Sequence, residues 1–170
     1  TNLITSSEDF IVSPWNTFGS PVAVAINQIE APNGTVTANL LTTTSTAANE
    51  YRYVCGLSNS NQLAFSVYLK KGNHDFIQYR TNSSSSGFVN FDLANGTYNA
   101  TTATGSITDV GNGWYRCTAV FAAATIASVQ IQFVSSLSAF RSETWTPTQY
   151  MTLYAWGAQA EESSYATSYI

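Results

Sequence analysis

The chain has 170 residues, of which only 9% are charged and 14% are aromatic, and its formal net charge is −4. Ordinary soluble domains contain about 25% charged residues, so this surface has to consist mainly of hydroxyl and amide side chains. The aromatic content excludes a disordered chain, the shortage of Lys and Arg argues against a nucleic-acid partner, and no apolar run is long enough for a membrane-spanning helix. The length predicts one domain, residues 1–170.

Apolar and polar residues alternate along most of the chain, which is the pattern of strands with one buried face. Asn-Gly pairs and Gly-rich breaks separate the runs, and no window has the period of a capped helix. We therefore expect an all-β fold, a two-sheet antiparallel β-sandwich of jelly-roll type. The expected strands lie near residues 2–4, 22–28, 35–42, 50–57, 62–71, 75–81, 88–93, 97–101, 105–109, 113–122, 128–134 and 150–159.

One side of the clearest strands is apolar and should form the core. The residues expected to be buried there are Phe65, Val67, Leu69, Tyr115, Cys117, Ala119, Phe121, Ile131 and Phe133. The two cysteines, Cys55 and Cys117, could form a disulfide if oxidised, but each lies in an apolar alternation of a different strand. We expect two buried free thiols, and without a CxxC pair or a Cys/His cluster we expect no zinc.

The other side of the same strands combines aromatic rings with long hydrogen-bonding side chains. Such a surface suits a neutral sugar chain, because the apolar face of a pyranose stacks on a ring and its hydroxyls bind amide and guanidinium groups. The alternative is an outer face that is merely solvated or covered by a loop. The candidate sugar-binding residues, assumed to share one sheet face, are Tyr68, Gln78, Arg80, Trp114, Arg116, Gln130 and Gln132, with Trp145 as a loop wall or as a plug over the core.

Catalytic chemistry has little support in the sequence. The single histidine, His74, is expected in a hairpin loop, and the ten Asp and Glu residues fall mostly at turns or chain ends. A glycosidase needs two carboxylates that flank a cleft on rigid elements, and none of these acids lies on the polar side of a clear strand. We therefore expect a protein that is not an enzyme.

Several motifs resemble a known family. The segments NLITSSEDF, FSVYLKKGNHDFIQYR, ITDVGNGWYRCTAVF and LYAWGAQAEESSYATSYI are similar to β-sandwich modules of phage tail and other virion proteins, over nearly the whole chain. The chain departs from the usual pattern at Ala160, where Leu is common, and at Ser163 and Ser164, which replace Gly. Such modules are similar to the jelly-roll carbohydrate-binding modules of secreted glycoside hydrolases and polysaccharide lyases.

The resemblance implies a non-catalytic carbohydrate-binding domain that attaches to a polysaccharide or a cell-surface glycan, in a virion protein or a secreted carbohydrate-active enzyme. The alternative is a structural tail-fibre or capsid-decoration domain that packs on other virion subunits and has no sugar ligand. Both imply an extracellular or virion-surface location. Jelly-roll modules of this kind also often hold a structural Ca²⁺, for which the candidate ligands here are Glu8, Asp9, Glu161 and Glu162.

Overall fold

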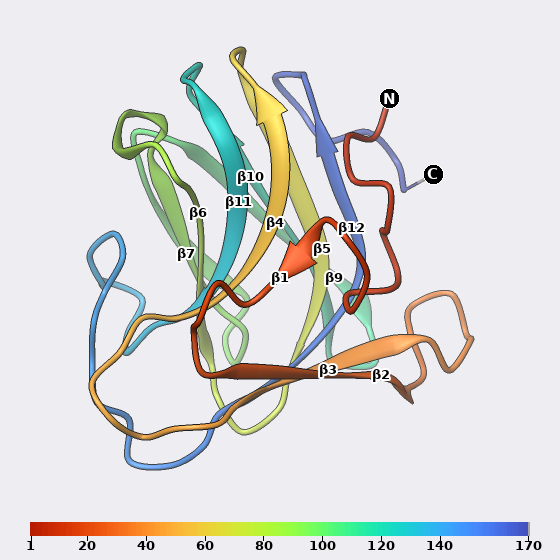
Figure 1. Cartoon of the computed structure of the whole chain (residues 1–170). Coiled ribbons are helices and arrows are strands. Elements are labelled where there is room, and N and C mark those ends of the chain that lie inside the picture. Colours follow the sequence, from red (N-terminus) through yellow and green to blue (C-terminus); the bar gives the residue numbers. More distant parts are fainter. Residues whose placement is uncertain (170) are drawn as a thin grey trace.

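The computed structural model describes residues 1–169, which form two six-stranded antiparallel sheets packed face to face (Figure 1). One 3-10 turn, η1 (Ser84–Ser86), is the only helical element among these residues, and none of their helices could span a membrane. In spatial order, sheet A contains β1 (Trp15–Asn16), β4 (Tyr51–Asn59), β11 (Ile126–Phe133), β6 (Phe76–Thr81), β7 (Phe88–Asp92) and β8 (Thr97–Thr101). Sheet B contains β2 (Val22–Ile29), β3 (Ala38–Thr43), β12 (Thr152–Glu161), β5 (Leu63–Lys71), β10 (Trp114–Phe121) and β9 (Thr104–Gly111).

The strand order is that of a jelly roll. Strand β3 pairs with β12, β4 with β11, β5 with β10, and β6 with β7, so the strands pair as in one long hairpin that is rolled up. The order β3-β12-β5-β10 in sheet B therefore faces β4-β11-β6-β7 in sheet A. The chain changes sheets between β5 and β6 and again between β10 and β11, and this alternation decides where the candidate site residues lie.

The predicted core is confirmed with one exception. Eight of the nine predicted residues are buried between the sheets, and Cys117 and Ala119 of β10 lie opposite Val67 and Phe65 of β5. Tyr115 is only half-buried. It follows a register shift at the start of β10, and its ring lies against Gly96 in the β7–β8 turn.

The two thiols are free, as predicted. Cys55 lies on β4 of sheet A and Cys117 on β10 of sheet B, and both are buried. Burial raises the pKa of the Cys55 thiol to about 12 and also raises the pKa of Cys117. Because the thiolate is the reactive form, both side chains are unreactive components of the core.

The strand predicted near residues 2–4 is wrong, whereas the other predicted strands are present, with ends that differ by at most three residues from the prediction. The side chain of Asn2 replaces a backbone ladder there: its Nδ2 donates to the Ala158 carbonyl, and its Oδ1 accepts from the Ile4 and Ala160 amides. One backbone bond, from Leu3 N to Ala160 O at 2.7 Å, completes the attachment. The two ends of the chain consequently lie side by side next to β12 (Figure 1).

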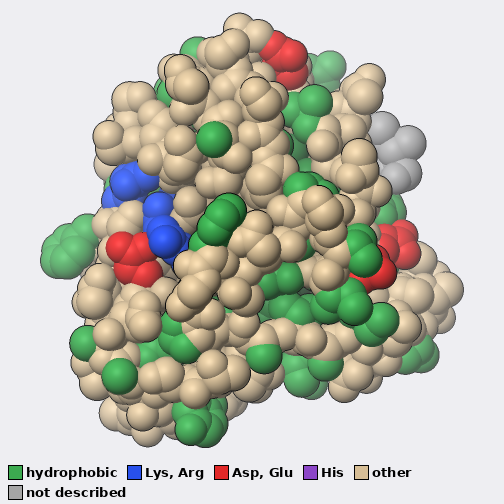
Figure 2. Space-filling model, in the orientation of Figure 1, with side chains coloured by type: hydrophobic (Ala, Val, Ile, Leu, Met, Phe, Trp, Pro, Cys, Tyr) green, Lys and Arg blue, Asp and Glu red, His purple; other side chains and the backbone are tan. Residues whose placement is uncertain are grey.

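Charged side chains are sparse on the surface. Figure 2 shows a face made mostly of uncharged polar groups and backbone, with a patch where basic and acidic side chains adjoin. At Glu50 a carboxylate lies 3.2 Å from Arg52 and 2.8 Å from Arg80. The composition had indicated such a surface.

Candidate functional site

The predicted sugar-binding residues do not share one face. Tyr68 lies on β5 and Trp114 and Arg116 lie on β10, so these three side chains are on the outer face of sheet B. The four others lie on β6 and β11, on the outer face of sheet A: Gln78, Arg80, Gln130 and Gln132. The assumption of a common face is therefore wrong, because the chain changes sheets between β5 and β6 and between β10 and β11.

A long loop covers the outer face of sheet A. This cover loop (residues 134–151) connects β11 to β12 and is held by the amide side chains beneath it. Gln78 Nε2 donates to the Phe140 carbonyl at 2.9 Å, and Gln132 Nε2 donates to the Glu143 carbonyl at 2.7 Å. Asn90 Nδ2 donates to the Ala139 carbonyl at 2.7 Å. These amides are buried, and they bind the loop backbone.

Arg80 belongs to the same buried network. Its Nε donates to Gln132 Oε1 at 3.0 Å and its Nη2 to Glu50 Oε2 at 2.8 Å. Burial lowers the pKa of the guanidinium to about 10, although Glu50 opposes the shift. The group remains charged at neutral pH, and its hydrogen bonds hold the network together. Gln130 is also buried and donates to Ser128 Oγ at 3.2 Å.

Trp145 closes one end of the sandwich. Its indole N–H donates to the Phe133 carbonyl at 3.1 Å, and its ring meets Tyr51 edge-on with centroids 6.5 Å apart. The His74 ring packs against Trp145 with centroids 5.6 Å apart, and its Nε2–H donates to the Val134 carbonyl at 2.7 Å. Trp145 is therefore a plug over the core, the second of its two expected roles.

The outer face of sheet B carries a cluster of rings. Trp114 is only 2% exposed, and its indole N–H donates to the Glu30 carbonyl of the β2–β3 turn at 3.2 Å. Trp156 donates in the same way to Thr37 Oγ1 at 3.0 Å and packs against Tyr68. The folded-back turn shields both indoles, so Trp114 is not an open stacking platform.

The C-terminal segment (residues 163–169) lies on the same face. The Glu161 carboxylate accepts from Thr167 N at 2.8 Å and from Thr167 Oγ1 at 2.7 Å, while Arg116 donates to the Thr167 carbonyl. The Tyr169 ring packs against Trp156 in a tilted arrangement, with centroids 4.6 Å apart and an angle of 49° between the ring planes. These contacts fix the segment beside β10. Ile170, the last residue of the ATSYI motif, lies outside the described residues.

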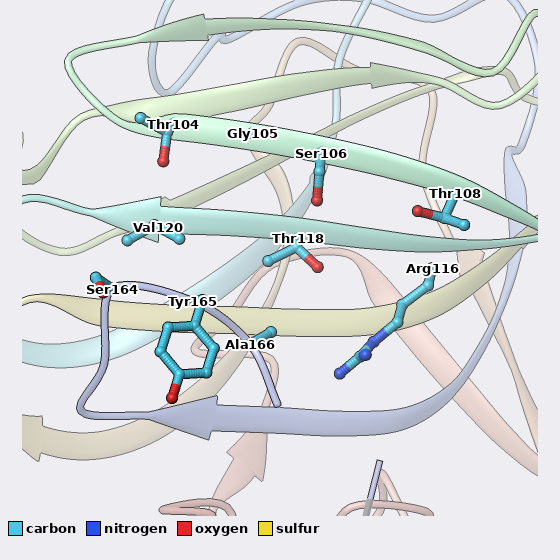
Figure 3. Close-up of a pocket in the computed structure, with 10 residues that line it drawn as sticks. All are labelled: Thr104, Gly105, Ser106, Thr108, Arg116, Thr118, Val120, Ser164, Tyr165 and Ala166. Carbon is cyan, nitrogen blue, oxygen red and sulfur yellow. The ribbon is translucent and has the colours of Figure 1, made fainter. Parts of the chain in front are cut away.

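A polar trough remains between this segment and the edge of sheet B. Thr104, Ser106 and Thr108 alternate outward along β9, each opposite an outward residue of β10. The hollow has a volume of about 320 Å³ (Figure 3). Its lining is Thr104, Gly105, Ser106, Thr108, Arg116, Thr118, Val120, Ser164, Tyr165 and Ala166.

The trough offers hydroxyls, one guanidinium and one ring. Tyr165 is 64% exposed and belongs to the C-terminal segment that borders the trough, and Figure 3 shows its ring on the side of that segment away from β9. Arg116 extends from β10 toward the C-terminal segment, and its Nη2 also donates to Ser66 Oγ at 3.2 Å. The described lining contains no Asp, Glu or His, so its groups are suited to hydrogen bonding and stacking and do not form an acid–base pair.

Sequence reasoning placed Arg116 in the site but missed Tyr165 and the hydroxyl row. The alternation of Thr104, Ser106 and Thr108 is visible in the sequence, and pairing it with the alternation of β10 would have identified the trough floor. No comparable signal marked Tyr165, because its position depends on the fold of the C-terminal segment.

The acids proposed for calcium are engaged separately. Glu161 binds Thr167, Glu8 Oε1 accepts from the Tyr169 hydroxyl at 2.9 Å, and Asp9 Oδ1 accepts from Ile11 N at 3.2 Å. Glu162 accepts from Asn61. Within residues 1–169 no three His, Cys, Asp or Glu side chains gather at one point, and these carboxylates do not fit one ion as they are placed. Calcium binding stays a prediction.

In comparisons with known proteins, the chain matches no family model and no curated protein sequence. The interpretation of the trough therefore depends on its own residues.

Proposed function

We propose that this domain is a non-catalytic carbohydrate-binding module whose ligand lies in the trough along β9 and β10. The observation that carries the proposal is the lining itself: two neighbouring rows of outward residues, rich in hydroxyls, bordered by the C-terminal segment with its exposed Tyr165 ring. Hydroxyl groups donate and accept hydrogen bonds with sugar hydroxyls, and the Tyr165 ring presents a flat apolar surface to a pyranose. Arg116 adds a fork of donors at one end.

The wider setting belongs to the same proposal. The motif resemblance and the uncharged polar surface support a module of a virion protein or of a secreted carbohydrate-active enzyme, located outside the cell or on the virion surface. Its partner would be a polysaccharide or a cell-surface glycan. Arg116 is the one basic group among the described lining residues of the trough, and this low positive charge supports a neutral ligand over a nucleic acid.

A structural virion domain is the second candidate, and one observation favours it. Phe18 and Phe140 are large apolar side chains with most of their surface exposed, and both lie outside the trough. Exposed rings of this kind also occur where a subunit packs on another. Size-exclusion chromatography with light scattering would show concentration-dependent assembly, and Phe18→Ser with Phe140→Ser would abolish it.

The test of sugar binding is a pull-down with insoluble cellulose, xylan, mannan, chitin and pectin, together with a glycan array. The Tyr165→Ala variant should bind the selected polysaccharide about tenfold more weakly, since it loses one stacking surface. Tyr150→Ala is the matched control, because Tyr150 is similarly exposed on the cover loop, away from the trough. Absence of binding to every probe, or equal binding by parent and Tyr165→Ala, would refute the proposed site.

A further inference from the structure

A second hollow lies on the outer face of sheet B, beyond the Arg116 end of the trough. It has a volume of about 560 Å³ and lies under the β2–β3 turn, where Glu30, Lys70, Trp114 and Tyr154 contribute to its lining. Lys70 lies opposite Trp114 on one side and opposite Tyr154 on the other, so β10, β5 and β12 form its floor. It belongs to the same outer face of sheet B as the trough.

The two hollows lie in line along β10. Val120, Thr118 and Arg116 line the trough, and Trp114, the next outward residue, lines the second hollow. A strand rises about 3.3 Å per residue, so the run from Val120 to Trp114 is about 20 Å long. This length exceeds what one sugar ring occupies and matches a short stretch of linked rings.

The second hollow has the chemistry to hold a sugar. Tyr154 is half-buried and contributes a ring, while Lys70 Nζ is held at the rim by the Asn112 carbonyl at 2.7 Å. The exposed Glu30 lies on the facing turn. An amine and a carboxylate beside a ring supply donor and acceptor groups for hydroxyls, together with an apolar surface.

We propose that the trough and the second hollow form one groove, so that the ligand is an internal stretch of a polysaccharide chain and not a single or terminal sugar. This inference rests on the proposed function. Between Arg116 and Trp114 of β10, the bound polysaccharide would pass from the hydroxyl-lined part of the groove to the ring-lined part.

The experiment is a calorimetric titration with fragments of one to eight sugar units, made by partial hydrolysis of the polysaccharide that the pull-down selects. For the parent, affinity should rise at least tenfold between one and four units and then level off. Tyr154→Ala and Lys70→Met should each weaken tetramer binding about fivefold or more and leave binding of the shortest bound fragment unchanged. Tyr150→Ala, which removes an exposed ring of the cover loop, is the matched control and should bind like the parent.

The outcomes separate this inference from the proposed function. If single sugars bind as tightly as longer fragments and Tyr165→Ala weakens them, the trough is a terminal-sugar site and the continuous groove is wrong. If Tyr154→Ala and Lys70→Met both bind the tetramer like the parent, the second hollow is not part of the site. If no fragment of any length binds, the proposed function itself fails, and this inference fails with it.

Discussion

The outer faces of the two sheets are built from the same alternating pattern, but a loop covers the face of sheet A whereas part of the face of sheet B stays open. On sheet A, the amide side chains of Gln78, Asn90 and Gln132 donate hydrogen bonds to the backbone of the cover loop and are buried beneath it. On sheet B, rings hold the β2–β3 turn and the C-terminal segment, and the strip along β9 stays open.

Side-chain reach explains the difference. Glutamine and asparagine carry donor and acceptor groups at the end of a flexible stem, so they can satisfy the backbone of a loop that crosses above the strands. Thr104, Ser106 and Thr108 have hydroxyls close to the β9 backbone, and those hydroxyls cannot span the distance to an overlying chain. Long amides on an outer face therefore indicate a covered face, whereas a row of hydroxyls at a sheet edge indicates a face that remains available for ligand.

The largest effect should come from the buried indole of sheet B. Trp114→Ala should lower the free energy of unfolding by about 3–5 kcal/mol, since the ring is buried and its removal leaves a cavity. Urea denaturation followed by circular dichroism measures this change. Tyr165→Ala, on the same face but exposed, should change stability by less than about 0.5 kcal/mol. Equal stability of Trp114→Ala and the parent would show that the cluster does not contribute to folding.

The cover loop of sheet A should be the next most sensitive region. Gln78→Leu should lower the free energy of unfolding by about 2 kcal/mol, because it leaves the Phe140 carbonyl and the Ser142 amide without partners. The same substitution at Gln62, which is exposed, is the control and should be nearly neutral. Sugar binding should be unchanged in both variants. A loss of binding in Gln78→Leu would mean that the two faces are coupled.

Lowering the pH should reduce the free energy of unfolding through protonation of His74. Burial lowers the pKa of this imidazole below its ordinary value, although two backbone hydrogen bonds and Asp75 oppose the shift. The unfolded chain then binds a proton more readily than the folded one, so stability is lost as pH falls from about 7 to 5. We expect the parent to lose more stability over this interval than His74→Gln. Parallel stability–pH curves for the two proteins would contradict the assignment.

The smallest effect should be that of salt on ligand binding. The dissociation constant of a neutral polysaccharide should change by less than about twofold between 50 and 500 mM NaCl, because salt screens interactions between charges and such a ligand is held by stacking and hydrogen bonds. A steep loss of affinity with salt would instead identify an acidic glycan bound through Arg116 and Lys70. Lys70→Met would then flatten the salt dependence.

The sequence predicted most of the fold because the alternation is a local signal. Phe65, Phe121 and Phe133 are buried on the side that their parity indicated, and the strands that carry them were located within a few residues. The strand near residues 2–4 failed because Asn2, a single side chain, takes the hydrogen bonds that a ladder would have made.

The candidate site was harder because it depends on which strands are neighbours. The alternation along each strand indicated that Tyr68 and Gln78 both point away from the core. It could not indicate that the two residues belong to opposite sheets. The expected jelly roll already implied this separation, since its chain changes sheets between β5 and β6. Loop coverage had no local signal, and for that reason the burial of Gln132 and the exposure of Tyr165 could be seen only in the folded chain.

The meeting of both chain ends beside β12 has a mechanical consequence. Ala158 N of β12 donates to the Ser7 carbonyl at 2.8 Å, and the Tyr169 hydroxyl donates to Glu8 at 2.9 Å, so short contacts attach the N-terminal segment to β12 and to the C-terminal segment. Tension applied between residues 2 and 169 would load these contacts first and would bypass the strands of the trough. A domain pulled in this way would keep the β9–β10 floor of its binding groove in place until the end segments separate, and the C-terminal segment that borders the groove would then move first.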